Sequence, residues 1–153
     1  MEKNSISFRL RSDVVIELGL LRTFLSQVET LNFKRPLIIW DKNLKNSDYF
    51  ESIQPQLEEF SVDGAFIPIE LQGEPSYELL SKLLNKFDMN RFDSVVSLGG
   101  GSVMDIGKGL ALLASNPCDP KTLKGFPTGL NAPLPHVTIP SVLGSGAEAS
   151  FNA

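Results

Sequence analysis

A run of three glycines and a serine is the first place in the sequence where an anionic ligand could bind. Gly99, Gly100, Gly101 and Ser102 follow a short apolar segment and precede a long one. Glycines let a backbone approach a ligand without Cβ clashes, and the unpaired N–H groups of a helix start carry partial positive charge. A helix beginning here would suit the diphosphate of a dinucleotide, with the Ser102 hydroxyl as a further donor. Such a turn also occurs as a plain connection.

An aspartate at the end of another apolar run is the second candidate. Asp41 directly follows Leu37–Trp40. A carboxylate at a strand end can accept both ribose hydroxyls of an adenosine, and it disfavours NADP because it repels a 2′-phosphate. The residues therefore favour NAD, although Asp at a strand end also serves as a turn or cap residue.

A segment of small residues near the end of the sequence is the third candidate. It contains Thr138, Ser141, Ser145 and Gly146. Their hydroxyls and exposed amides suit a ribose, a phosphate or an amide, but small-residue loops also serve as tight connections.

The remaining reactive side chains fit structural roles better. His136 is the sole histidine and cannot build a multi-histidine metal site, and Cys118 is the sole cysteine and cannot form an internal disulfide. The absence of disulfides agrees with a reducing compartment, and we expect a cytoplasmic protein. Asp105 and Lys108 are spaced i, i+3 and are expected to pair on one helix.

The apolar pattern predicts alternating strands and helices. A short continuous apolar run indicates a strand and an i, i+3, i+4 spacing indicates a helix, and Ser76 is the expected N-cap of the third predicted helix. Pro55 is expected to kink or divide its helix, and Pro68 to mark a sheet edge. Strands are expected at 37–40, 65–69, 94–98 and 136–139, with one or two edge strands within 5–18; helices are expected from 19, over 47–60, after 75 and over 103–114, and a surface loop over 115–135.

Strands separated by helices imply a doubly wound, mostly parallel sheet with helices on both faces, a Rossmann-like α/β fold. The 153 residues suit one domain. Open parallel sheets bind ligands at the carboxyl ends of their strands, which is where the three candidate groups lie.

Composition excludes other partners. Eighteen acidic and 14 basic residues give a net charge of −4, and the Lys and Arg residues are scattered. We therefore expect no nucleic-acid binding. No apolar stretch approaches the roughly 18 residues that span a bilayer, and the N-terminus lacks a signal-peptide pattern, so no membrane association is expected.

Together, three segments resemble the iron-containing alcohol dehydrogenase family. They are GGGSVMDIGK, HVTIPSVLGSGAEAS and LIIWDKNL. The resemblance runs along the whole chain and implies that residues 1–153 form an NAD(P)-binding N-terminal domain of an oxidoreductase.

The resemblance also implies cofactor contacts. Gly100, Gly101 and Ser102 would hold the diphosphate and Asp41 the ribose. Glu74 would lie beside the adenosine. Ser141, Val142, Ser145 and Ser150 take positions where the family has cofactor-contacting Thr residues, and Gly107 replaces a usual Ala.

Family members carry a divalent metal, iron or zinc, on Asp and His residues of a C-terminal helical domain that this chain lacks. The resemblance thus implies an alcohol or sugar-acid substrate, is compatible with a homodimer, and leaves the catalytic residues unassigned. We expect this chain alone to bind dinucleotide weakly and to turn nothing over.

Two alternatives stay open. Dehydroquinate-synthase-like cyclases share this kind of first domain and use NAD transiently, although SGAEAS is atypical of them. A nucleotide-binding module that acts by association, without catalysis, is the other.

Overall fold

The computed structural model describes residues 13–16, 28, 30–71, 73–125, 127–142 and 144–147. Three α-helices are described, namely α2 (Asp48–Phe60), α3 (Tyr77–Lys86) and α4 (Gly101–Ser115). The strands are β1 (Pro36–Asp41), β2 (Ala65–Ile69), β3 (Ser94–Gly99) and β4 (His136–Pro140). Short 3₁₀ turns are η2 (Lys42–Leu44), η3 (Met89–Arg91) and η4 (Pro120–Leu123).

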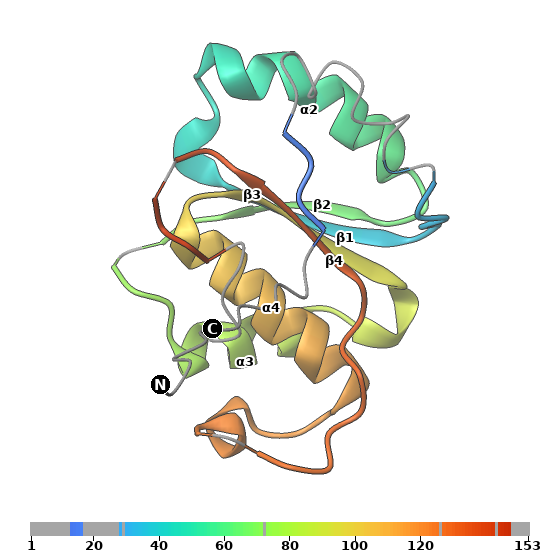
Figure 1. Ribbon diagram of the computed structural model, residues 1–153, viewed down its shortest axis with the longest axis vertical. Coiled ribbons are helices and arrows are strands. Elements are labelled where there is room, and N and C mark those ends of the chain that lie inside the picture. Colours follow the sequence, from blue (N-terminus) through green and yellow to red (C-terminus); the bar gives the residue numbers. More distant parts are fainter. Residues whose placement is uncertain are drawn as a thin grey trace, which may run out of the picture.

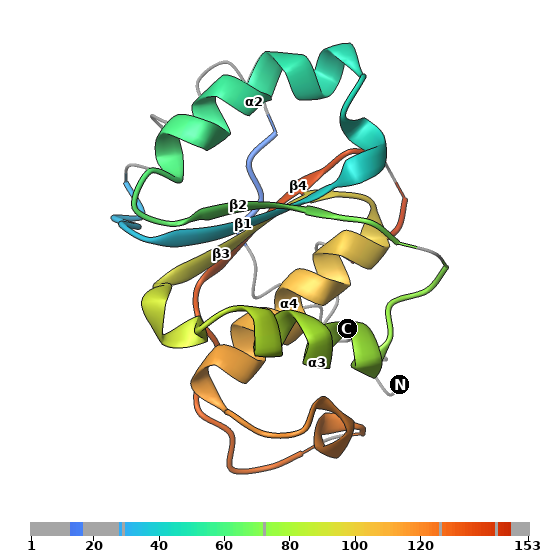
Figure 2. The same ribbon diagram turned by 180° about the vertical axis from the view of Figure 1, so that it is seen from behind.

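The four strands form one parallel sheet in the order β2-β1-β3-β4. Helix α2 covers one face, and α3 and α4 cover the other (Figures 1 and 2). From β1 the chain passes first to β2 on one side and later to β3 on the other, so the winding direction reverses between β1 and β3. The predicted doubly wound fold is confirmed, and its reversal point lies at the carboxyl ends of these two strands.

Alternation along β1 divides the core between the two faces of the sheet. Ile38 and Trp40 pack with Phe50 on the α2 side, where Trp40 and Phe50 stack with ring centroids 4.2 Å apart. Leu37 and Ile39 pack on the side of α3 and α4. Burial of both faces explains the continuous apolar run of β1 and holds its carboxyl end in a fixed position.

Several expectations change in detail. Residues 13–16 form no strand, their apolar side chains are exposed, and they do not pair with any of the four described strands. The rest of the predicted edge strands and nearly all of the helix expected from residue 19 lie outside the described residues. Pro55 does not divide α2, because it lies on the exposed side while Phe50, Ile53 and Leu57 anchor the helix in the core.

The other predicted elements are confirmed with small shifts. Ser76 caps α3, its Oγ accepting from the Leu79 N–H at 3.2 Å, and the Pro68 strand is an edge strand. Helix α4 begins at Gly101, two residues earlier than expected, and η4 interrupts the loop expected over 115–135.

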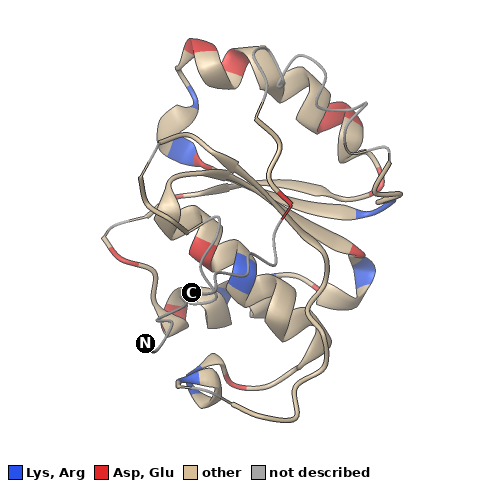
Figure 3. Ribbon diagram, viewed as in Figure 1, with Lys and Arg blue, Asp and Glu red and all other residues tan. Residues whose placement is uncertain are grey.

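Lys, Arg, Asp and Glu residues are distributed over several of the described helices, turns and loops (Figure 3). Within the described part of the chain, no helix has the length and apolarity that a membrane crossing requires.

Candidate dinucleotide-binding site

The carboxyl ends of the parallel strands β1, β3 and β4 lie side by side at one end of the sheet, which is the edge meant below. A Cβ built on Gly99 would lie 3.1 Å from the Cβ of Asp41, so the two strand ends are in close contact. The Ser141 N–H donates to the Gly99 carbonyl at 2.9 Å and ties the loop after β4 to the same place. Three segments singled out in the sequence therefore converge at the reversal point of the sheet.

Helix α4 begins at this edge without a side-chain cap. Its N-cap is Gly100, which is extended and makes no side-chain cap bond among the described residues. Every other described helix or 3₁₀ turn is capped, by Asp41, Ser47, Ser76, Asp88 and Asp119 respectively along the chain. The N-terminus of α4 is thus the one described helix start whose N-cap residue gives no side-chain hydrogen bond to the first amides, and it suits an anionic ligand.

The loop after β4 packs against this helix start. A Cβ on Gly101 would lie 3.0 Å from the Ser145 Cβ, and one on Gly100 would lie 3.5 Å from Val142 Cγ2. Ser145 Oγ accepts from the Ala147 N–H at 3.3 Å, which holds the loop in a turn. The half-buried glycines at 100 and 101 let the loop approach the helix start, and this glycine-lined helix start beside the loop is called the cradle below.

Asp41 serves first as the cap of η2. Its Oδ1 accepts from the Asn43 N–H at 2.9 Å, and the side chain remains partly exposed. A cap role and a ribose-binding role for Asp41 are therefore compatible, because the cap bond fixes the carboxylate beside Gly99.

Other predicted site residues lie further from the cradle. Thr138 lies inside β4, opposite Ser97 in the register, and two residues before the strand ends. Glu74 lines a hollow of about 420 Å³ between the end of β2 and the start of α3. Ser150 lies outside the described residues.

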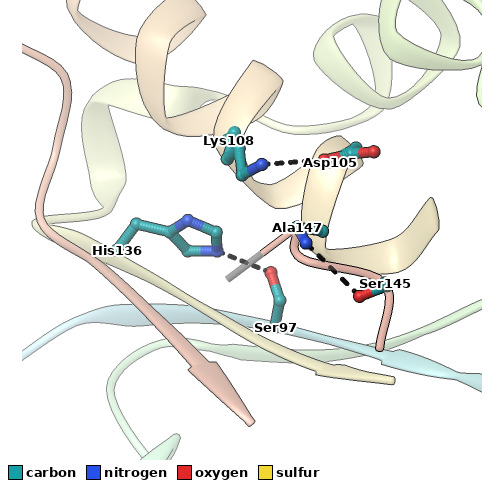
Figure 4. Close-up of polar contacts among 6 residues, drawn as sticks. All are labelled: Ser97, Asp105, Lys108, His136, Ser145 and Ala147. Carbon is teal, nitrogen blue, oxygen red and sulfur yellow. Dashed lines mark hydrogen bonds and ion pairs between the residues drawn. The ribbon is translucent and has the colours of Figure 1, made fainter. Parts of the chain in front are cut away.

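Asp105 and Lys108 form the ion pair expected from their spacing, with Lys108 Nζ 2.9 Å from Asp105 Oδ1 (Figure 4). Asp105 lies one turn from the helix start, where a lone carboxylate would repel a diphosphate. Pairing with Lys108 neutralises much of that charge.

A polar contact between a buried serine and a half-buried histidine lies beneath the middle of α4. Ser97 Oγ and His136 Nε2 are hydrogen-bonded at 2.7 Å (Figure 4). A Cβ on Gly107 would overlap Ser97 Oγ and would lie 2.6 Å from His136 Nε2. Burial, and then the positive charge of Lys108, lower the pKa of His136 to about 4, so the imidazole is neutral at pH 7. The structural role expected for His136 agrees with this enclosed position.

Sequence reasoning missed one pair at the same edge of the sheet. Lys42 Nζ lies 2.7 Å from Glu70 Oε2. Glu70 directly follows the strand predicted over 65–69, Lys42 lies two residues after the strand predicted over 37–40, and neighbouring parallel strands have their carboxyl ends at the same end of the sheet. That adjacency was the signal that could have revealed the pair.

A larger hollow of about 640 Å³ lies between α3 and residues 118–121 and contains none of the predicted site residues.

Across the described ranges, no group of three or more His, Cys, Asp or Glu residues could hold a metal ion. The described residues therefore do not fit the divalent metal that the resemblance implies.

Comparison with known proteins gives a consistent result. The family model for iron-containing alcohol dehydrogenases matches residues 12–153. A mitochondrial hydroxyacid-oxoacid transhydrogenase of Caenorhabditis briggsae is 31% identical over 153 residues, covering 96% of this chain and 31% of that protein. An NAD-dependent methanol dehydrogenase of Bacillus methanolicus is 26% identical, covering 89% of this chain and 35% of that protein. The chain spans about a third of the length of these relatives.

Solved structures show the same relation. An iron-containing alcohol dehydrogenase from Thermotoga maritima superposes with a TM-score of 0.78 at 28% identity, covering 94% of this chain and 40% of that one. A sulfoacetaldehyde reductase from Bifidobacterium kashiwanohense, solved in complex with NAD⁺, shares the fold with a TM-score of 0.69 at 19% identity, covering 86% of this chain and 35% of that one.

Proposed function

The chain belongs to the iron-containing alcohol dehydrogenase family, and on that premise we propose that it is the NAD-binding part of an oxidoreductase. The observation that carries the proposal is the uncapped start of α4 at the reversal point of the sheet. Such a helix start attracts a diphosphate through unpaired N–H groups and the helix dipole. NAD, when bound, accepts a hydride from the carbon of an alcohol.

The residues of this chain bind and orient the cofactor. Backbone amides of Gly100, Gly101 and Ser102 would hold the diphosphate, and the glycines fit it because they add no side chain of their own between the backbone and the ligand. The loop after β4 would close over it from the other side, with Ser145 next to Gly101. Ser141, Val142, Thr138 and Ser150 complete the proposed set of contacts.

Asp41 would select NAD over NADP. Its carboxylate, fixed by the Asn43 N–H, would face the ribose hydroxyls and repel a 2′-phosphate.

Hydride transfer itself needs residues that the described part of this chain does not supply. The relatives are about three times as long, and the described residues hold no metal-ligand cluster. We propose that the divalent metal and the alcohol or hydroxyacid substrate bind to the remainder of a full-length relative, and that this chain alone has no turnover. A homodimer and a cytoplasmic location stay predictions, and some matched relatives are mitochondrial by name.

Titration with NADH tests the proposal. The chain has one Trp, Trp40, next to Asp41 in β1. Bound NADH should quench its emission by energy transfer and should fluoresce itself on excitation of Trp40. Saturable binding without turnover of alcohols supports the proposal. Absence of saturable binding contradicts it. Turnover by this chain contradicts the proposal that the metal and the substrate bind to the remainder of a full-length relative.

A further inference from the structure

An ion pair adjoins the ribose-binding edge of the sheet. In the register of β1 and β2, Asp41 lies opposite Ile69, and the next residue on each side belongs to the pair. Lys42 Nζ donates to Glu70 Oε2 at 2.7 Å. This hydrogen bond, and then the charge of Lys42, lower the pKa of Glu70, so the carboxylate stays ionised. A lysine and two carboxylates thus share one end of the sheet.

Stability does not account for this pair. The side chains of Lys42 and Glu70 are 52% and 63% exposed. Exposed pairs contribute little to folding because water and salt screen them and because ordering two long side chains costs entropy. Its main consequence is therefore where it places the ammonium group.

A bound 2′-phosphate would need a positively charged partner, and the ammonium of Lys42 is such a group. Lys42 is adjacent in the chain to Asp41, and its flexible four-carbon stem can reach a phosphate on a ribose held by Asp41. Basic residues near the acidic position accommodate that phosphate in NADP-binding folds of this kind. Glu70 draws the ammonium away toward β2.

We infer that Glu70 is a second determinant of the preference for NAD over NADP, acting by holding Lys42 away from the 2′ position of the ribose. The inference rests on the proposed function, which places the adenosine ribose at Asp41. Asp41 would repel the extra phosphate directly, whereas Glu70 withholds the cation that would offset the repulsion.

NADH and NADPH titrations of Glu70→Gln test this role. Release of Lys42 should tighten NADPH binding about fivefold, the size of one exposed charge-assisted contact, and should leave NADH binding within about twofold. Adding Lys42→Met should abolish the gain. Glu59→Gln is the matched control. Glu59 is exposed on α2, and this substitution removes the same charge at a place away from the site.

The possible results separate the role of Glu70 from dinucleotide binding as such. A gain in NADPH binding that disappears with Lys42→Met supports the inference. An unchanged ratio of the two affinities, an equal gain in Glu59→Gln, or a gain that survives Lys42→Met overturns it and leaves the proposed function intact. If the parent chain binds neither dinucleotide, the proposed function fails and the inference fails with it.

Discussion

Helix α4 uses glycine at its start and in its middle for different reasons. At the start, Gly100 and Gly101 provide no side-chain cap and let the loop after β4 pack against the backbone. In the middle, Gly107 makes room for the buried Ser97 and the half-buried His136, which lie beneath the helix. A helical Gly costs about 1 kcal/mol relative to Ala. Gly107 therefore gives up helix stability for packing, whereas Gly100, at the N-cap, costs only about a few tenths of a kcal/mol relative to a capping side chain.

The largest effect is expected in the middle region. Gly107→Ala would force a methyl group into Ser97 Oγ and His136 Nε2, and overpacking of this kind costs about 2–3 kcal/mol despite the better helix propensity of Ala. Urea unfolding followed by Trp40 fluorescence measures the loss.

Gly109→Ala is its control, because that methyl would meet the flexible end of Leu80 at 3.0 Å, which can move. We expect a change within about 0.5 kcal/mol. A Gly107→Ala variant as stable as Gly109→Ala would contradict the packing role.

The imidazole of His136 should make the free energy of unfolding depend on pH. The pKa of His136 is about 4 in the folded chain, against 6.5 for an unperturbed His. The unfolded chain therefore binds more protons between these values, and stability falls as the pH falls from about 6.5 to 4. The full difference is about 3 kcal/mol.

His136→Gln removes this titration and keeps an amide that can bond to Ser97. Subtracting its unfolding free energy from that of the parent cancels the carboxylates that titrate in the same range. A difference that stays flat between pH 7 and pH 4 would show that His136 is not held neutral.

A capping side chain at the start of α4 should raise folding stability and weaken NADH binding. Gly100→Asp would place a carboxylate at the first amides of α4, where 3.5 Å to Val142 Cγ2 leaves room for a side chain. We expect folding to gain a few tenths of a kcal/mol. NADH binding should weaken at least about tenfold, because the carboxylate occupies the cradle and repels the diphosphate.

Gly100→Asn, which caps without charge, should weaken binding less, and comparing the two by fluorescence titration separates blocking from repulsion. Unchanged NADH affinity in Gly100→Asp would mean that the diphosphate binds elsewhere.

The smallest effect concerns an ordinary helix start. Ser76→Ala removes the acceptor of the Leu79 N–H and should cost about 1 kcal/mol in urea unfolding. Ser102→Ala at the start of α4 should cost less than about 0.5 kcal/mol, since no described cap bond is lost. Equal losses in the two variants would contradict the contrast between capped and uncapped starts.

Local patterns predicted most of the fold. Runs such as Leu37–Trp40 identify buried strands because both faces of a parallel sheet are covered, and Pro68 identifies the edge strand. The division of α2 that Pro55 suggested was wrong, because an exposed proline removes one hydrogen bond while the core contacts of α2 persist. The 3₁₀ turns were missed, since Asp caps of three-residue turns leave no periodicity.

The site was predictable only in part. Asp41, the glycine run and Ser141 each follow a strand, and parallel strands bring their carboxyl ends together. The contact between Ser97 and His136 depends on the register of β3 and β4 and on the packing of α4, which no local pattern contains.

Amide chemical shifts of the ¹⁵N-labelled chain, recorded during titration with NAD⁺, test the central claim most directly. The account predicts that the largest changes fall on the amides of Gly101, Ser102 and Ser141, and that Gly100→Asp suppresses them. Unchanged shifts at these amides under saturating NAD⁺, or changes confined to the hollow between α3 and residues 118–121, would contradict it.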